Sequence, residues 1–185
     1  DAGRIEKFLL RQLDRRTRAW IRLNEVTSER SPYTATILHG HYRDWFSDRN
    51  VPATIRGRLV YFGLIRPYKG VESLLDAFQE INSQQSPELV LRIDGNPKND
   101  TLRIQIEKAC RADHRIQALL AYVDDATTAR EIGEAELVVL PYRQMHNSGS
   151  LLLALSLCRP VLVPRNQANE VLGAEVGPGW VSLYD

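Results

Sequence analysis

The sequence predicts an α/β protein built on a doubly wound parallel sheet, and three observations support this prediction. From Arg58 onward, short apolar runs of strand length alternate with segments of helical periodicity. In the stretch 136–164, polar residues are concentrated where an apolar strand meets the next helix. A chain of 185 residues with 43% hydrophobic residues is long enough to bury one full core. Alternating strands and helices form right-handed βαβ units, and such units make a parallel sheet.

Six apolar runs account for the expected sheet. They cover residues 59–62, 89–93, 116–122, 137–140, 161–163 and 180–184. Helical segments begin near Val71, run through 102–110, start again at a cap on Asp124 or Asp125, and continue at 151–157. Six strands connected in this way predict the Rossmann-like order 3-2-1-4-5-6. In that order the first and fourth strands are neighbours, so the loops that follow them meet at one crevice.

The first part of the chain predicts elements outside this sheet. Residues 4–18 place four apolar side chains on one helical face and six Arg or Lys residues elsewhere. A basic amphipathic helix can lie on an anionic membrane surface, but packing on a neighbouring domain is commoner, and we favour it here. Short strands are expected within 19–26 and 34–38, and a linker within 47–56.

The run 39–46 is dense in polar and aromatic side chains. His39 and His41 are separated by one residue, so they could ligate a metal. No cysteine or acidic residue recurs at ligand spacing, however, and we therefore expect a hinge or cleft segment here.

Composition excludes several classes of protein. The net charge of +1 gives no reason to expect a nucleic-acid partner. Cys110 and Cys158 lie in apolar helical patterns and are expected to be buried free thiols of a reducing compartment. No apolar run approaches the ~20 residues of a membrane span, and no signal peptide is visible. The chain starts within a helical pattern and stops directly after a strand-like run, so we expect a piece of a longer protein.

Two loops together predict a phosphate site. The sequence Ser148-Gly149-Ser150 opens the helix after the fourth strand, where free N–H groups, hydroxyls and the helix dipole suit an anion. Taken alone, Ser148 or Ser150 could be an ordinary N-cap. The loop after the first strand adds Arg66, which can bind two oxygens at once, and Lys69, a mobile point charge. Their convergence at one crevice predicts a diphosphate site.

Residues 62–70 (FGLIRPYKG) resemble the donor-site loop of group 1 glycosyltransferases, which have the GT-B fold. Leu-Pro-Tyr at 140–142, then Ser-Gly, an apolar helix and Arg-Pro-Val at 159–161 are similar to that family's second signature. The resemblance covers 58–184. It implies that residues 51–185 bind a nucleotide sugar, and that residues 1–50 are the hinge and the end of an N-terminal acceptor domain. The expected lining residues of the donor site are Gly63, Gly95, Tyr142 and Asn147.

The sequence departs from the family pattern at three positions. Retaining members carry Glu-x7-Glu across the second signature, and these positions fall on Met145 and Leu153. Neither side chain accepts a hydrogen bond from a sugar hydroxyl as a carboxylate does. The family's Arg after the first-loop Gly is Leu64 here, with Arg66 as the substitute. Diphosphate binding is therefore what the resemblance implies here, and an inverting reaction would take its base from the N-terminal half.

The expected function is transfer of a sugar from a nucleoside-diphosphate sugar to an acceptor saccharide or glycolipid by the full-length protein. No cofactor and no metal are expected, since GT-B enzymes generally need none. The expected location is the cytoplasm, with peripheral contact at the inner face of the membrane as an option. A non-catalytic nucleotide-sugar-binding or scaffolding domain remains an alternative. A Rossmann-type oxidoreductase is disfavoured because no Gly-x-Gly-x-x-Gly follows any expected strand.

Overall fold

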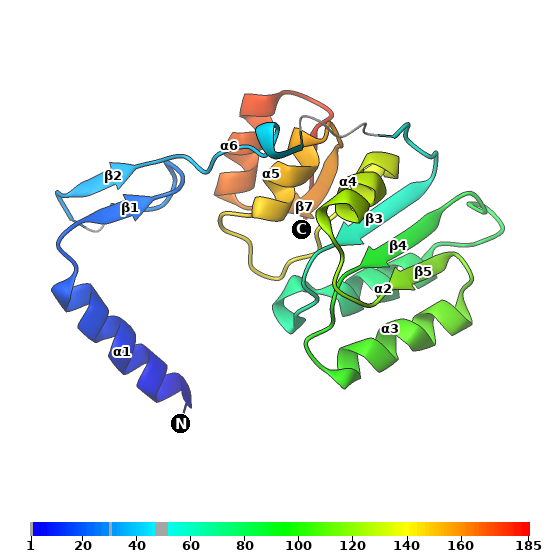
Figure 1. The fold of residues 1–185 in the computed structure, drawn as a ribbon, viewed down its shortest axis with the longest axis horizontal. Coiled ribbons are helices and arrows are strands. Elements are labelled where there is room, and N and C mark those ends of the chain that lie inside the picture. Colours follow the sequence, from blue (N-terminus) through cyan, green and yellow to red (C-terminus); the bar gives the residue numbers. More distant parts are fainter. Residues whose placement is uncertain (1, 30, 47–51) are drawn as a thin grey trace. The chain divides into compact units, whose positions relative to one another are not determined.

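The computed structural model describes residues 2–29, 31–46 and 52–185 (Figure 1). The chain forms two compact units, Asp1–His39 and Gly40–Asp185, and each is described by itself.

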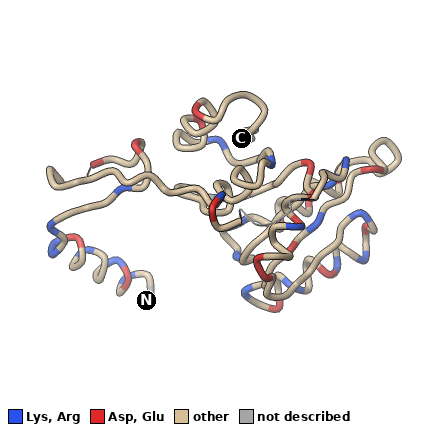
Figure 2. Tube along the Cα trace, turned by 45° about the horizontal axis from the view of Figure 1, so that its top comes forward, with Lys and Arg blue, Asp and Glu red and all other residues tan. Residues whose placement is uncertain are grey.

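The first unit contains one helix and a two-stranded parallel sheet. Its elements are α1 (Ala2–Arg16), β1 (Trp20–Arg22) and β2 (Thr34–Thr36). The amphipathic pattern does form a helix, and Figure 2 shows basic residues spread along it. The apolar face is open within this unit: Ile5 and Leu13 are each 62% exposed. No described helix is both long and apolar enough to cross a membrane.

The second unit is a six-stranded parallel sheet with helices. Its strands are β3 (Arg58–Phe62), β4 (Val90–Asp94), β5 (Ile116–Leu119), β6 (Leu137–Val139), β7 (Val161–Pro164) and β8 (Val181–Tyr184). The α-helices are α2 (Val71–Glu80), α3 (Asp100–Ala112), α4 (Asp125–Glu134), α5 (Gly149–Ser156) and α6 (Gln167–Val176). Short 3-10 turns are η1 (Asp44–Phe46) and η2 (Pro67–Lys69). The strand order β5-β4-β3-β6-β7-β8 confirms the predicted order, with the first and fourth strands of this sheet side by side.

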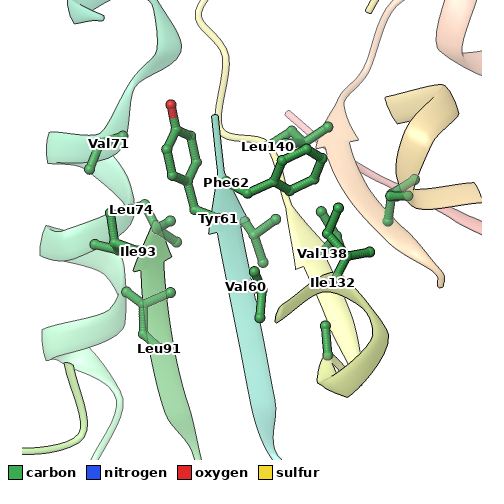
Figure 3. Packing of buried hydrophobic residues seen from close by; sticks show 14 of the residues in the cluster. Val60, Tyr61, Phe62, Val71, Leu74, Leu91, Ile93, Ile132, Val138 and Leu140 are labelled. Carbon is green, nitrogen blue, oxygen red and sulfur yellow. The ribbon is translucent and has the colours of Figure 1, made fainter. Parts of the chain in front are cut away.

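The core lies on both faces of the central strands (Figure 3). Because side chains alternate along a strand, Tyr61 points toward α2, where it meets Val71 and Leu74. Val60 and Phe62 point to the opposite face, which α4 covers with Ile132. This arrangement explains why the strands are short apolar runs: a parallel sheet with helices on both faces hides both sets of side chains.

Of the run 39–46, predicted as a hinge or cleft, His39 belongs to the first unit and residues 40–46 belong to the second. The Tyr42 N–H donates to Ser156 Oγ at 2.9 Å, and Phe46 is buried. Of the expected linker, residues 47–51 lie outside the described residues. The rest is held against the unit: the Ile55 N–H donates to the carbonyl of Glu134 at 2.9 Å, and Arg159 Nη2 donates to the carbonyl of Pro52 at 3.0 Å.

The prediction of two buried thiols was wrong. Cys158 is exposed and Cys110 is only partly buried. Helix α5 ends at Ser156, and Cys158 then takes a left-handed conformation with φ of 56° before Pro160. The helical pattern of the sequence continues to Cys158, but the backbone turns out of the helix first, and the thiol leaves the buried face.

Candidate functional site

The loops after β3 and β6 meet at the carboxyl edge of the sheet. The Arg143 N–H donates to the carbonyl of Tyr68 at 2.9 Å, which ties one loop to the other. Gly70, between η2 and α2, has a left-handed φ of 66° and lies against Pro141. A Cβ on Gly70 would fall 2.0 Å from the Pro141 carbonyl oxygen, so only glycine allows this approach.

A hollow of about 200 Å³ opens where these loops meet, and we call it the loop hollow. It is lined by Tyr68, Lys69, Tyr142, Gln144, Met145, His146, Asn147, Ser148, Gly149 and Ser150. Lys69 Nζ lies 4.8 Å from the centroid of the Tyr142 ring, and the Tyr142 hydroxyl is 3.2 Å from Ser150 Oγ. The structure thus brings Lys69, Tyr142, Asn147 and the 148–150 segment to one hollow, and their binding of a donor stays a prediction.

The start of α5 has two separate roles in this hollow. Ser148 is the N-cap, and its hydroxyl accepts a hydrogen bond from the Leu151 N–H at 3.3 Å. The ordinary capping role weighed for this serine is therefore real. Gly149 and Ser150 occupy the first helical positions, whose N–H groups have no acceptor inside the helix. These two amides and the Ser150 hydroxyl are what the helix start offers to an anion.

Gly63 and Gly95 bring two backbones together beside this hollow. A Cβ on Gly63 would lie 3.7 Å from Lys69 Nζ and 3.9 Å from Ser150 Oγ. A Cβ on Gly95 would lie 1.8 Å from the Gly63 carbonyl oxygen. The two predicted lining glycines are therefore in contact, and Gly63 stands next to the cation and the hydroxyl.

Arg66 was also predicted to bind phosphate, but it does not line the loop hollow. It is the N-cap of η2, half-buried, with extended φ and ψ of −132° and 151°. Its guanidinium is one of the charges that act on the Tyr61 hydroxyl, whose pKa is raised chiefly by burial. Its predicted role at the phosphates stays a prediction.

A second hollow, of about 180 Å³, lies on the α4 side of the same edge, and we call it the β4–β5 hollow. It is lined by Phe62, Gly63, Leu64, Asp94, Gly95, Asn96, Ala121, Tyr122, Val123, Thr128 and Glu131. Gly63 borders this hollow and stands beside Lys69 and Ser150 of the other, so the two hollows are adjacent.

A network of buried and partly buried charges lies under α4, next to this second hollow. Arg58 pairs with Glu131 and, at 2.8 Å, with Glu134. Arg92 Nε lies 3.5 Å from Glu131 Oε2 and 2.9 Å from Asp94 Oδ1. Sequence analysis missed this network, because the second strand was expected to end before Asp94. One feature of the sequence could have revealed this network: charged residues occur within strands that are otherwise typical of a sheet covered on both faces.

Asp94 has an unusual electrostatic environment. Its side chain is 1% exposed, and burial raises the pKa of its carboxyl to about 6, with Arg92 acting in the opposite direction. Glu131 raises the pKa further and Arg58 lowers it. In the described part of the chain neither carboxylate oxygen has a hydrogen bond, since the contact with Arg92 is an ion pair without hydrogen-bond geometry.

The raised pKa of Asp94 predicts how the stability of the protein depends on pH. Between about pH 4 and pH 6 the folded state holds a proton that the unfolded state has released, so unfolding becomes easier as pH rises through this window. Asp94→Asn lacks this titration. The difference in the free energy of unfolding between Asp94→Asn and wild type should therefore shift in favour of the variant by roughly 1–3 kcal/mol between pH 4 and pH 7. Urea denaturation of both proteins at each pH measures this shift. Parallel stability curves for the two proteins would contradict this expectation.

Met145 and Leu153 both pack against the core, although Met145 also lines the loop hollow. Met145 is 6% exposed, and its sulfur accepts a hydrogen bond from Asn169 Nδ2 at 3.3 Å. Leu153 is half-buried and packs on the core. The residues described contain no cluster of three or more His, Cys, Asp or Glu arranged to hold a metal ion.

Known proteins resemble this chain along its whole length. A sequence model of the family described as Glycosyl transferases group 1 matches residues 56–181. A GDP-mannose:glycolipid 4-beta-D-mannosyltransferase of Xanthomonas campestris pv. campestris is 57% identical over 185 residues, which are 100% of this chain and 52% of that protein. A second protein of the same name and species gives the same identity and coverage. The chain thus spans about half the length of the curated relatives it matches.

Solved structures show the same fold at low sequence identity. TarM has a TM-score of 0.69 at 13% identity, covering 97% of this chain and 36% of its own. Anabaena HepE in complex with UDP and glucose has a TM-score of 0.67 at 14% identity, covering 96% of this chain and 52% of its own. The C-terminal domain of LpcC, a glycosyl transferase group 1 family protein from Francisella tularensis, has a TM-score of 0.55 at 16% identity, covering 78% and 75%. These likenesses confirm the predicted Rossmann-like, GT-B-type fold.

Proposed function

Since this chain belongs to the group 1 glycosyl transferases, we propose that it is the donor-binding part of an enzyme that transfers mannose from GDP-mannose to a glycolipid. The observation that carries this proposal is the meeting of Lys69, Gly63 and the start of α5 at one edge of the sheet. The donor and the acceptor are taken from the name of the relatives at 57% identity.

The residues of the loop hollow suit a departing nucleoside diphosphate. When the bond between the sugar C1 and the diphosphate breaks, negative charge develops on the diphosphate. Lys69 and the Gly149 and Ser150 amides can stabilise that charge, and loss of one such interaction commonly costs ~3 kcal/mol. The acceptor hydroxyl oxygen bonds to C1 and gives its proton to a base. We assign that base to the half of the enzyme that residues 51–185 do not contain.

The residue types at Met145 and Leu153 support an inverting reaction. Neither side chain offers a carboxylate to the sugar or the ribose. The relative's name specifies a β-linked product, and transfer from an α-linked nucleotide sugar to a β product inverts C1. No metal is needed in this scheme, because Lys69 and the helix start supply the positive charge.

The first unit supports peripheral membrane contact as part of the proposal. Helix α1 exposes Phe8 and Leu9 beside Lys and Arg side chains, and a glycolipid acceptor resides in a membrane. We place the full-length protein in the cytoplasm, at the inner face of the membrane. Packing of α1 on the N-terminal acceptor domain is the competing use of the same face, since we assign residues 1–50 to the end of that domain and the hinge.

The test compares the full-length protein with the 185-residue chain, using GDP-mannose, a membrane glycolipid acceptor and a chelator. The full-length protein should transfer mannose with the chelator present. The chain alone should bind GDP and transfer nothing, because it lacks most of the acceptor half. Transfer by the chain alone would contradict the proposal that the chain binds the donor and the other half of the enzyme supplies the base. GDP binding without turnover by the full-length protein would favour the alternative, a non-catalytic binding domain. Met145 and Leu153 are consistent with this alternative because neither supplies a carboxylate.

A further inference from the structure

Met145 is the buried point of an otherwise exposed stretch of the loop between β6 and α5. It is 6% exposed and packs with the core, whereas Gln144 and His146 on either side of it are exposed. All three residues line the loop hollow. Because the backbone runs through this buried point, whatever holds Met145 also fixes the course of its neighbours along the hollow.

Two asparagines at the start of α6 hold Met145. Asn166 Nδ2 donates to the Met145 carbonyl at 3.1 Å, and Asn169 Nδ2 donates to the Met145 sulfur at 3.3 Å. The same Asn169 amide also donates at 2.8 Å to the carbonyl of Pro164, the last residue of β7. The loop after β6 is thus tied to the end of the neighbouring strand by an Asn169 side chain that is 1% exposed.

The side chain of Asn166 has two tasks that can be separated. Asn166 is the N-cap of α6, and its Oδ1 accepts a hydrogen bond from the Asn169 N–H at 2.9 Å. Capping needs only the side-chain oxygen, and serine or aspartate would serve equally well. The amide nitrogen of Asn166 is therefore not needed for the helix, and its hydrogen bond goes to the loop instead.

Two other contacts hold the same loop. The Arg143 N–H donates to the carbonyl of Tyr68, and the Tyr142 hydroxyl lies 3.2 Å from Ser150 Oγ. Both contacts involve residues that line the loop hollow, whereas the two asparagines act from outside it. With these attachments in place the loop is ordered before a ligand arrives, and an ordered site loses less entropy on binding.

We propose that Asn166 and Asn169 are positioning residues of the donor site: they hold Met145 so that the loop 140–148 keeps the hollow shaped for a diphosphate. The inference rests on the proposed function, because it needs a nucleoside diphosphate in the loop hollow. Neither asparagine contacts the ligand in this scheme, since both act through Met145. Without their hydrogen bonds the loop relaxes, and GDP binding must then restore its order at a cost in affinity.

Asn166→Ser tests this role, because serine keeps the cap but has no amide to bind the Met145 carbonyl. In calorimetric titration of the 185-residue chain, its affinity for GDP should fall roughly threefold to tenfold, the equivalent of about one neutral hydrogen bond. Affinity for guanosine should stay unchanged, since guanosine has no phosphate to place in the hollow. A purely structural role would lower the stability to urea and leave the GDP affinity of the folded protein as it is, and this result would overturn the proposal.

Met145 is the one methionine of the chain, so a ¹³C-methyl-methionine label reports directly on it in NMR spectra. In wild type the methyl signal should be that of a fixed side chain both with and without GDP. In Asn166→Ser the signal of the free protein should shift and broaden, and GDP should move it back toward the wild-type position. Asn169→Leu, which removes the donor to the sulfur, should show the same change more strongly. If that buried substitution prevents folding, Asn166→Ser decides alone, and an unchanged methyl signal there would overturn the proposal.

Asn99→Ser is the matched control. Asn99 is the N-cap of α3, and its Oδ1 accepts a hydrogen bond from the Leu102 N–H at 3.0 Å, so the same substitution is made in the same kind of cap. It lines neither hollow and should leave GDP affinity and the methyl signal unchanged. If Asn166→Ser behaved like Asn99→Ser while wild type bound GDP, the positioning role would fall and the proposed function would stand. If wild type bound no GDP, the proposed function would fall, and the positioning role with it.

Discussion

Lys69→Ala is expected to weaken binding of a nucleoside diphosphate by roughly 1.5–3 kcal/mol, the range for hydrogen bonds to charged groups. Lys69 is the lysine of the loop hollow, and its Nζ stands beside Gly63 and above the Tyr142 ring. The free nucleoside has no phosphate to lose, so its affinity should stay unchanged. Calorimetric titration with the diphosphate and with the nucleoside measures both effects.

Lys108→Ala is the matched control for this prediction, since it removes an exposed lysine of α3 that lines neither hollow. It should leave both affinities as they are. The fold should lose little in Lys69→Ala, about 0.5–1 kcal/mol for the contact with the Tyr142 ring. Arg66→Ala tests the remaining predicted cation in the same titration. Equal diphosphate affinity of wild type and Lys69→Ala would end the assignment of the loop hollow to the phosphates.

Gly70→Ala is expected to lower the free energy of unfolding by roughly 2–5 kcal/mol, the sum of left-handed strain and a forced repacking. The new Cβ would fall 2.0 Å from the Pro141 carbonyl oxygen, which belongs to the backbone and cannot rotate away. The loops after β3 and β6 would have to separate. Urea denaturation measures the loss, and weaker diphosphate binding should accompany it in the protein that remains folded.

Gly179→Ala separates the two causes. Gly179 also has a positive φ, of 88°, but a Cβ there would meet nothing within 4 Å. Its loss should be limited to the strain of the left-handed conformation, roughly 1–2 kcal/mol. If Gly70→Ala were no more destabilising than Gly179→Ala, the close contact between the two loops would not contribute to stability.

Local patterns were enough to predict the sheet and one part of the site. A strand that is covered on both faces needs apolar residues at consecutive positions. Runs such as 59–62 and 137–140 have this composition, which by itself predicts interior strands. The right-handed connection rule then leaves few ways to order six such strands, and it places the loop of Lys69 beside Ser148–Ser150. Ser148 could be recognised as a cap because capping depends on residues within one helical turn.

Other features depend on contacts between distant parts of the chain, and only the tertiary structure decided them. Charged side chains can be exposed or buried in a fold. Asp94 and Glu131 are buried, and Arg58 and Arg92 are partly buried, because α4 packs over that end of β3 and β4. The exposure of Cys158 depends on where the backbone leaves α5, whose last residue, Ser156, lies two positions before the cysteine. The sequence by itself determined the order of the strands and the placement of Lys69 beside Ser148–Ser150, since both follow from local periodicity and chain connectivity. The buried carboxylate of Asp94 and its ion pair with Arg92 arise from long-range packing, which no local pattern records.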